Sequence, residues 1–242
     1  MSGDWLISLE GVGCSFKARK GRLRLGEYEA FNDISFNLYP GETLGVVGRN
    51  GAGKTTLLRI LARIFLPNKG TIRFRDDLTI SLLSLQLGFS PDLSGRYNAI
   101  MGAILLGYTR KEAEARLDRI IEFSGLGAWI DEPIKTYSDG MCARLGFAVA
   151  METSPDVLLV DEVLGVGDET FRNKSVMAMK ERLKSGQTVV FVSHDVHTLQ
   201  ELCTRVIWLE HGRVRMDGSA EDVLSAYMDF MRSESVEEAP LG

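Results

Sequence analysis

The chain has 242 residues, of which 45% are hydrophobic and 25% are charged, values close to the average for a soluble globular protein. Such a composition can bury a sizeable core and excludes wholesale disorder. The formal net charge of −5 argues against general nucleic-acid binding, because that binding depends on neutralising phosphates with lysine and arginine.

The first quarter of the chain predicts strands followed by a helix. Residues 7–16 and 30–38 alternate between apolar and polar side chains, which is typical of antiparallel strands near the edge of a sheet. Residues 43–47 form a short apolar run, and a glycine cluster then leads into a helical pattern at 54–64. We therefore expect a buried strand, a tight turn and a helix in that order.

The middle of the chain, from about residue 95 to 153, has a helical pattern. Thr109 followed three residues later by Glu112 forms a capping box, which predicts a helix that Gly125 can end. We interpret this region as a helical subdomain, about residues 88–154, inserted into an α/β core.

The last third of the chain returns to alternating strands and helices. Near-continuous valine and leucine runs at 156–160 and 188–193 favour a parallel sheet that is covered on both faces. Ser219–Asp222 is the predicted cap of a last helix. We expect one domain over residues 1–232 and a flexible acidic tail over 233–242.

Neither a disulfide framework nor a secretory segment is indicated. The three cysteines are widely spaced and include no Cys-x-x-Cys pair, which favours a reducing compartment. The N-terminus lacks the features of a signal peptide, and no stretch approaches the ~18 consecutive apolar residues of a membrane span. We expect a cytosolic protein whose membrane role, if it has one, comes through a partner.

A glycine-rich segment, Gly48-Arg-Asn-Gly-Ala-Gly-Lys54-Thr55, matches the P-loop pattern G-x-x-x-x-G-K-[ST] between a predicted strand and a predicted helix. Its glycines let backbone N–H groups turn inward as an anion cradle, and the following helix directs its positive end at the phosphates. Lys54 would reach the β- and γ-phosphates of ATP, Thr55 would ligate Mg²⁺, and Thr56 lies within reach of the α-phosphate. The predicted phosphate-binding residues are Gly48, Asn50, Gly51, Ala52, Gly53, Lys54, Thr55 and Thr56.

Two carboxylates end the strand that is predicted after the helical region. The run Val157-Leu-Leu-Val leads directly into Asp161 and Glu162. Asp161 would hold Mg²⁺ through water, and Glu162 would accept a proton from the attacking water as the general base. ATP and Mg²⁺ are therefore the expected cofactors.

The segment Tyr137-Ser138-Asp139-Gly140 precedes an apolar-periodic helix and resembles the signature motif of the ATP-binding subunits of ABC transporters, usually Leu-Ser-Gly-Gly-Gln. In that family two subunits pack head to tail, and the signature of one closes over the nucleotide held by the P-loop of the other. The resemblance implies that these four residues form a second anion site facing the γ-phosphate. Asp139 departs from the commoner glycine, and its carboxylate would repel phosphate unless it points away or holds the loop.

The same resemblance implies an α/β fold, in which a P-loop NTPase core of the RecA-like type carries an antiparallel β subdomain and an inserted α-helical subdomain. His194 corresponds to the switch histidine that contacts the γ-phosphate, and with Lys54 and Glu162 it makes up the expected catalytic set. Asp168 keeps the final acid of the family's D-loop. Gln86 is the candidate for the glutamine that touches Mg²⁺ and water, with a loop packing role as the alternative.

An aromatic ring usually stacks on the adenine in this family. Tyr28 lies 26 positions before Lys54 and fits that role. Phe16 is the alternative if residues 17–27 are an insertion, and an edge-strand aromatic without a ligand is the other interpretation of Tyr28.

The motif variants resemble those of the ATPase subunits of bacterial polysaccharide exporters, which move O-antigen, capsule or teichoic-acid polymers assembled on a lipid carrier. The signature, the D-loop and residues 88–98, Gly-Phe-x-Pro-Asp-Leu-Ser-Gly-Arg-x-Asn, carry this resemblance. It implies a homodimer bound to two copies of an integral membrane permease at the cytoplasmic face of the bacterial inner membrane, with a lipid-linked polysaccharide as the transported substrate and no nucleic-acid partner. Some such ATPases continue into a β-rich carbohydrate-binding domain, and a sequence ending at Gly242 is expected to be the short form without it.

Residues 17–24 carry five positive charges in eight residues. This segment is either a solvated loop or a contact with anionic headgroups or the carrier's pyrophosphate at the membrane surface. Three rival functions are a soluble ABC ATPase that acts on nucleic acid or ribosomes, the ATPase of another ABC exporter, and a P-loop kinase. A single cassette with only a short helical insertion favours the transporter over the first of these, and the signature motif favours it over the kinase.

Overall fold

The computed structural model describes residues 5–20, 24–83, 88–161 and 168–237, which form nine strands, seven α-helices and two short 3-10 helices. The strands are β1 (Ile7–Lys20), β2 (Arg24–Leu38), β3 (Thr43–Val47), β4 (Lys69–Phe74), β5 (Ile80–Leu83), β6 (Val157–Asp161), β7 (Thr188–Val192), β8 (Arg205–Glu210) and β9 (Arg213–Ser219). The helices are α1 (Lys54–Leu61), α2 (Gly95–Leu105), α3 (Arg110–Ser124), η1 (Gly127–Asp131), η2 (Ile134–Thr136), α4 (Asp139–Met151), α5 (Glu169–Lys184), α6 (Val196–Leu202) and α7 (Ala220–Glu237).

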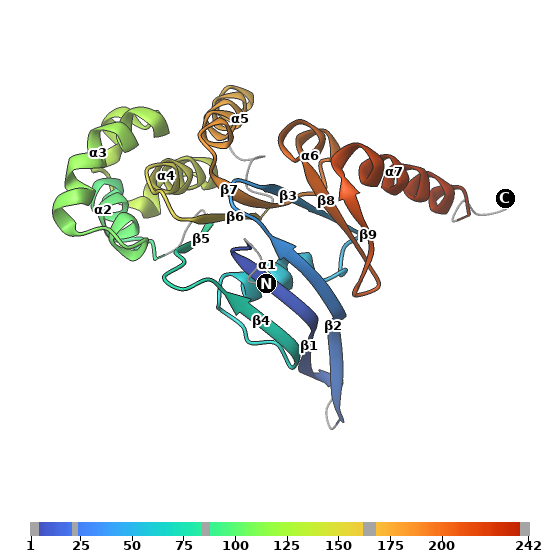
Figure 1. The fold of residues 1–242 in the computed structure, drawn as a ribbon. Coiled ribbons are helices and arrows are strands. Elements are labelled where there is room, and N and C mark those ends of the chain that lie inside the picture. The colour runs from blue at the N-terminus through green and yellow to red at the C-terminus, as the bar shows by residue number, and fades with distance from the viewer. Residues whose placement is uncertain (1–4, 21–23, 84–87, 162–167, 238–242) are drawn as a thin grey trace.

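The centre of the molecule is a six-stranded sheet in the order β5-β6-β7-β3-β8-β9 (Figure 1). Its first five strands are parallel, and β9 is antiparallel to β8. Successive side chains of each inner strand enter cores on opposite faces. Val190 and Val192 of β7 belong to one core, and Val189 and Phe191 belong to the other. The continuous apolar runs in the sequence are therefore explained by burial on both faces, as expected.

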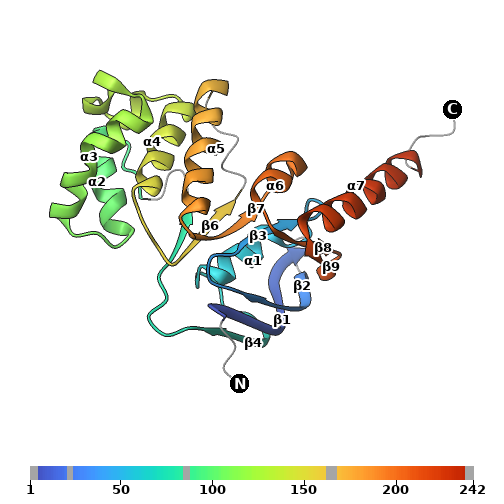
Figure 2. The same cartoon turned by 45° about the horizontal axis from the view of Figure 1, so that its top comes forward.

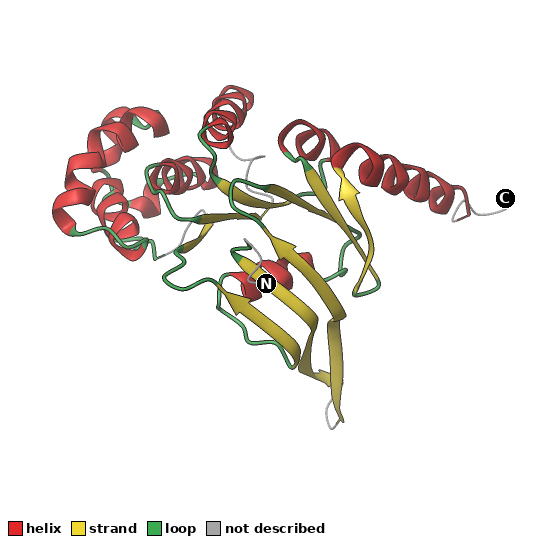
Figure 3. Ribbon diagram, viewed as in Figure 1, coloured by secondary structure: helices red, strands yellow, loops and turns green. Residues whose placement is uncertain are grey.

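A separate three-stranded antiparallel sheet, in the order β2-β1-β4, packs on one side of the central sheet. Helix α1 lies between the two sheets, where Leu57 and Leu58 are fully buried (Figure 1). The other helices gather along the opposite side of the central sheet and beyond its β5 end (Figure 3). We expected the first two strands near the edge of a sheet, but β1 is the central strand of its own sheet and is paired on both sides.

Helices α2, α3 and α4 form the helical subdomain beside the central sheet (Figure 2). The predicted capping box is confirmed, since Thr109 accepts a hydrogen bond from the Glu112 amide and the Glu112 carboxylate accepts one from the Thr109 amide. Gly125 ends α3 with a φ of 64°, in the left-handed region that favours glycine.

Two predicted helix ends differ from the structure. Helix α1 stops at Leu61 rather than residue 64, because the chain turns at Arg63, which adopts a φ of 60°. Helix α7 is capped by Ser219 as expected, but it continues to Glu237, so the tail predicted from residue 233 is helical at its start. In the described ranges, none of the helices has the length and apolar character needed to cross a bilayer.

Candidate nucleotide site

The loop between β3 and α1 has the backbone conformation that its glycines predict. Gly51 and Gly53 have φ values of 84° and 94°, which residues with a Cβ rarely adopt. A Cβ on Gly53 would lie 2.7 Å from the Ala30 carbonyl oxygen in β2. The loop can therefore connect β3 to α1 beside β2 only because residue 53 is a glycine.

Lys54, the first residue of α1, is turned into this loop. Its side chain is buried, and Nζ donates hydrogen bonds to the carbonyl oxygens of Gly48 (2.8 Å) and Arg49 (3.1 Å). An ammonium group with three donors is thus held inside the curve of the loop, at the positive end of α1. This arrangement places a cation where a phosphate would meet the loop.

A cavity of about 390 Å³ opens in front of this loop. It brings together residues from four elements, since β2, the loop, α1 and the last residue of β6 all contribute. A hydroxyl from Thr55 and a carboxylate from Asp161 are the oxygen ligands that Mg²⁺ prefers, and they share the cavity with the Lys54 ammonium. The lining residues are Tyr28, Asn50, Gly51, Gly53, Lys54, Thr55, Thr56 and Asp161.

The structure distinguishes between the two aromatic candidates. Tyr28 and Phe16 are paired across β2 and β1. Tyr28 is 50% exposed, lines the cavity, and its hydroxyl donates to the Gly51 carbonyl oxygen at 3.5 Å. Phe16 instead packs edge-on against Phe65, with 5.5 Å between the ring centroids. Tyr28 is therefore the ring available to a base at this cavity, and its stacking on adenine stays a prediction.

The signature residues lie at the start of α4, in the helical subdomain. Ser138 is the N-cap, and its hydroxyl accepts a hydrogen bond from the Met141 amide at 3.2 Å. Asp139 is exposed in the first turn of α4, where a carboxylate suits the helix dipole. Tyr137 donates its hydroxyl hydrogen to the Trp129 carbonyl oxygen, and Gly140 follows in the same helical turn.

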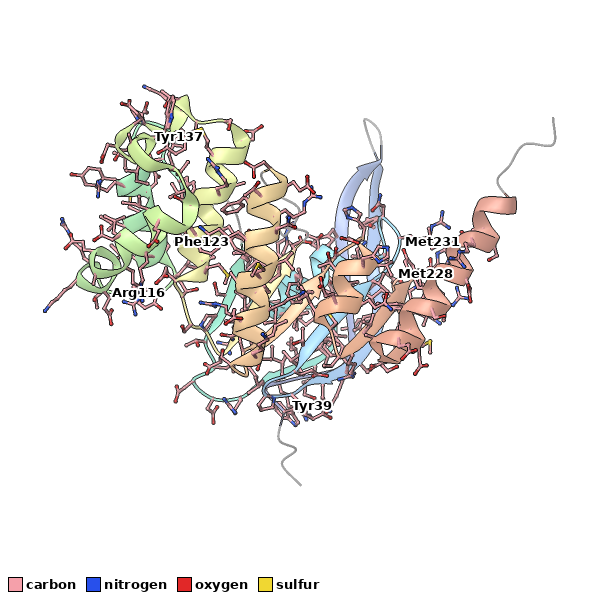
Figure 4. All side chains as sticks on the ribbon, turned by 90° about the horizontal axis from the view of Figure 1, so that it is seen from above. Tyr39, Arg116, Phe123, Tyr137, Met228 and Met231 are labelled. Carbon is pink, nitrogen blue, oxygen red and sulfur yellow. The ribbon has the colours of Figure 1, made fainter. Side chains whose placement is uncertain are left out.

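None of the residues from Tyr137 to Gly140 is among the described residues that line the 390 Å³ cavity. Tyr137 lies in the helical subdomain, on the far side of the molecule from α7 (Figure 4). A single copy of the described chain therefore presents the P-loop half and the signature half of the expected site at different places.

The remaining predicted residues follow the carboxyl ends of the parallel strands. His194 comes two residues after β7, is exposed, and lines a second cavity of about 620 Å³ on the other side of the P-loop. Asp168 caps α5 by accepting a hydrogen bond from the Phe171 amide at 2.8 Å. Glu162 and Gln86 lie outside the described residues.

Sequence reasoning missed two contacts near these residues. Arg49 of the P-loop forms an ion pair with Glu234 of α7, and no local pattern could indicate a pair 185 positions apart. Asn98 is fully buried in α2 and binds the segment before that helix, where a buried asparagine in the 88–98 motif was the available signal.

Comparison with known proteins identifies the family. The family described as "ABC transporter" matches residues 31–165. The O-antigen export system ATP-binding protein RfbB of Klebsiella pneumoniae is 45% identical over 217 residues, which cover 90% of this chain and 86% of that protein. RfbB of Myxococcus xanthus is 43% identical over 200 residues, 83% of this chain and 46% of that protein. The teichoic acids export ATP-binding protein TagH of Lactococcus lactis is 42% identical over 206 residues, 85% of this chain and 44% of that protein.

Solved structures share the fold at low sequence identity. The ATP-binding cassette MJ0796, solved as a dimer in a post-hydrolysis state with ADP and Pi, superposes with a TM-score of 0.74 at 21% identity, over 89% of this chain and 99% of that chain. The ATP-binding subunit of an ABC transporter gives a TM-score of 0.77 at 18% identity, over 95% and 98% of the two chains. With the P-loop cavity in place and RfbB 45% identical over most of both chains, this chain belongs to the ABC transporter family, among its ATP-binding proteins.

Proposed function

We propose that this protein is the ATP-hydrolysing subunit that powers export of a lipid-linked, O-antigen-like polysaccharide across the cytoplasmic membrane through a partner transmembrane subunit. The observation that supports the nucleotide chemistry is the cavity in which Lys54, Thr55 and Asp161 meet at the N-terminal end of α1. The 45% identity with an O-antigen export ATP-binding protein supports the transported substrate.

The proposed reaction gives each predicted site residue its own role. The P-loop amides and Lys54 would bind the phosphates, and Thr55 and Asp161 would hold Mg²⁺, which when bound would neutralise charge at the transferring phosphoryl group. Gln86 would add a contact to the metal and the attacking water. Glu162 accepts the proton of that water, and His194 contacts the γ-phosphate.

The proposed site is completed by a second copy of the chain. Among the described residues that line the 390 Å³ cavity there is no signature residue of the same chain to face a bound triphosphate. The Ser138 end of α4 from a second copy, with Tyr137, Asp139 and Gly140, would face it instead, and Asp168 would lie at the same dimer contact. Closure of the two copies on ATP would drive a permease dimer, and hydrolysis would reopen them. The subunit would lie at the cytoplasmic face of the bacterial inner membrane.

The nucleotide step is tested with two variants of opposite effect. Glu162→Gln should keep ATP binding, lower turnover by at least ~100-fold as expected for loss of a general base, and accumulate an ATP-bound dimer. Lys54→Ala should lose ATP affinity and stay monomeric. ATPase rates and light scattering with ATP measure both, and wild-type turnover in Glu162→Gln would remove this residue from the base role.

The export step needs a test in cells. Lys54→Ala should leave the lipid-linked polymer on the inner side of the membrane, and the wild-type protein should co-purify with an integral membrane protein. Co-purification with nucleic acid or ribosomes instead would favour the rival soluble ATPase. If the wild-type protein hydrolyses ATP but the Lys54→Ala strain does not retain the polymer, the ATPase of another ABC exporter would be favoured.

A further inference from the structure

Helix α7 reaches back to the P-loop, although the two are separated by most of the sequence. The guanidinium of Arg49 is ion-paired with the carboxylate of Glu234, and both side chains are about two-fifths exposed or less, at 41% and 35%. Glu234 lies seven residues after Tyr227 and three after Met231, so these side chains share one helix face. Tyr227, Met228 and Met231 line the 620 Å³ cavity beside the P-loop, and Figure 4 labels the two methionines on α7.

The position of α7 is fixed by aromatic contacts with the central sheet. Trp208 of β8 contacts the Tyr227 ring at 5.4 Å and the Phe230 ring at 5.2 Å between centroids. The Arg215 guanidinium of β9 lies over both Trp208 (4.3 Å) and Phe230 (4.1 Å). Glu234 follows Phe230 by one helical turn, so its carboxylate extends from a firmly packed segment.

The other end of the ion pair belongs to the phosphate-binding loop itself. The Arg49 carbonyl oxygen accepts hydrogen bonds from the Ala52 amide and from Lys54 Nζ, each at 3.1 Å. The backbone of Arg49 thus binds the P-loop turn and Lys54, and its side chain binds Glu234 of α7. Arg49 lines the 620 Å³ cavity beside α7, whereas it is not among the described residues that line the 390 Å³ nucleotide cavity.

We propose that Glu234 is a positioning residue that holds the P-loop through Arg49, so that nucleotide affinity depends on α7. The inference rests on the proposed nucleotide site but not on the proposed transport function. Fixing the long Arg49 side chain lowers the number of conformations open to the loop before phosphate binds. Loss of the pair should weaken nucleotide binding without altering the groups that perform hydrolysis.

The test is a double-mutant cycle on the full chain. Affinity for a non-hydrolysable ATP analogue is measured for Glu234→Gln, Arg49→Gln and the double variant. Each single change should raise the Kd about three-fold, as for a partly exposed ion pair, and the double variant should bind no more weakly than either single variant. Steady-state kinetics of Glu234→Gln should show a raised KM and an unchanged kcat, which marks lost binding rather than lost chemistry.

The matched control is Glu221→Gln, which makes the same change on an exposed residue in the first turn of α7. Its affinity should equal that of the wild type, and the thermal midpoint of Glu234→Gln should stay near the wild-type value because a partly exposed pair adds little to global stability. Unchanged affinity in Glu234→Gln, tighter binding, or fully additive single effects would each overturn the proposal. Lys54→Ala in the same assay separates a failure of the nucleotide site from a failure of the Glu234 proposal. Normal binding of the analogue by Lys54→Ala would contradict the proposed nucleotide site. If Lys54→Ala does not bind, the site stands, and the results for Glu234→Gln then test the positioning role alone.

Discussion

Lys54 shows how one residue can be held ready for a ligand. Its ammonium group is buried, and the two loop carbonyls of Gly48 and Arg49 accept its hydrogen bonds. A buried ammonium without such partners would be strongly destabilising. Because these acceptors belong to the same short loop, the lysine keeps its position through local contacts, and a phosphate oxygen can replace a carbonyl as partner.

Cys203 is a residue whose burial leads to a prediction about pH. It lies beneath β3, and burial raises the pKa of its thiol from 9.0 to about 12. The folded protein therefore keeps this thiol protonated in a range where the unfolded chain releases the proton. The resulting stabilisation is complete below about pH 9 and is lost as the pH rises toward 12.

We expect the free energy of unfolding of the wild type to fall between pH 9 and 10.5 more steeply than that of Cys203→Ala, because only the wild type carries this titration. Urea unfolding at several pH values measures the difference. The native Cys203 thiol should also resist a thiol reagent at pH 8 and react once the protein is unfolded. Parallel pH profiles of the two proteins would contradict the assignment.

At the scale of elements, the start of α2 depends on one buried amide. Asn98 accepts a hydrogen bond from the Ser90 amide at 2.7 Å, and its NH₂ group donates to the carbonyl oxygens of Ser90, Leu93 and Ser94 at 3.0 Å each. The residues that precede α2 are thereby tied to the helix. This segment connects the end of the β5 region to the helical subdomain.

Asn98→Ala should lower the free energy of unfolding by about 2 kcal/mol, because it removes the hydrogen bonds of a fully buried amide and takes away the side-chain acceptor of the Ser90 N–H group. Urea unfolding gives the value. Asn173→Ala is the control, since Asn173 is exposed on α5 and alanine is the better helix former. Similar stabilities for the two variants would show that the Asn98 contacts contribute little.

The basic segment forms part of a long hairpin. Strands β1 and β2 pair from Lys17 with Glu27 to Lys20 with Arg24, at the end of the hairpin that extends away from the central sheet (Figure 1). The described basic residues of this segment, at 17, 19, 20 and 24, therefore belong to strands that extend away from the central sheet, a position that fits contact with anionic headgroups.

Replacing the basic residues of 17–24 with glutamine should lower polysaccharide export several-fold, because each basic residue near an anionic surface contributes about 1 kcal/mol of attraction, and should leave ATPase activity in detergent unchanged. Export assays in cells and ATPase assays on purified protein measure the two effects. Lys111→Gln, an exposed change on α3, serves as the control. Unchanged export would favour the alternative interpretation, a solvated segment without a membrane role.

At the scale of the whole molecule, the nucleotide cavity is lined by residues from both sheets. Tyr28 comes from the antiparallel sheet, Asp161 from the central sheet, and Lys54 from the helix between them. A ligand that bridges these elements binds the folded protein and not the unfolded chain, so it stabilises the whole fold.

A non-hydrolysable ATP analogue with Mg²⁺, at about 100 times its Kd, should add about 2.7 kcal/mol, or roughly 5–10 °C in Tm for a chain of this size. EDTA should reduce the shift, because Thr55 and Asp161 then lack the metal they are proposed to hold. Thermal unfolding measures the effect. Lys54→Ala should show almost no shift, and a full shift in that variant would argue against the P-loop as the binding site.

The sequence by itself determined the features that depend on a few neighbouring residues. The glycines of 48–53, the capping box of Thr109 and the Ser138 cap were all predictable, because left-handed turns and capping hydrogen bonds are made within about one helical turn. The positions of β3, β6 and β7 followed from apolar runs, which reflect burial on two faces, whereas β4, β5, β8 and β9 were not predicted. The assignments of Glu162 and Gln86 remain predictions from the sequence.

Only the tertiary structure decided which distant residues meet. It placed Tyr28 rather than Phe16 at the cavity, set β1 in the centre of a separate sheet, and joined Arg49 to Glu234. It also separated Ser138 from the P-loop cavity of the same chain. These outcomes depend on how whole helices and sheets pack, and the packing geometry between elements far apart in sequence leaves no local pattern.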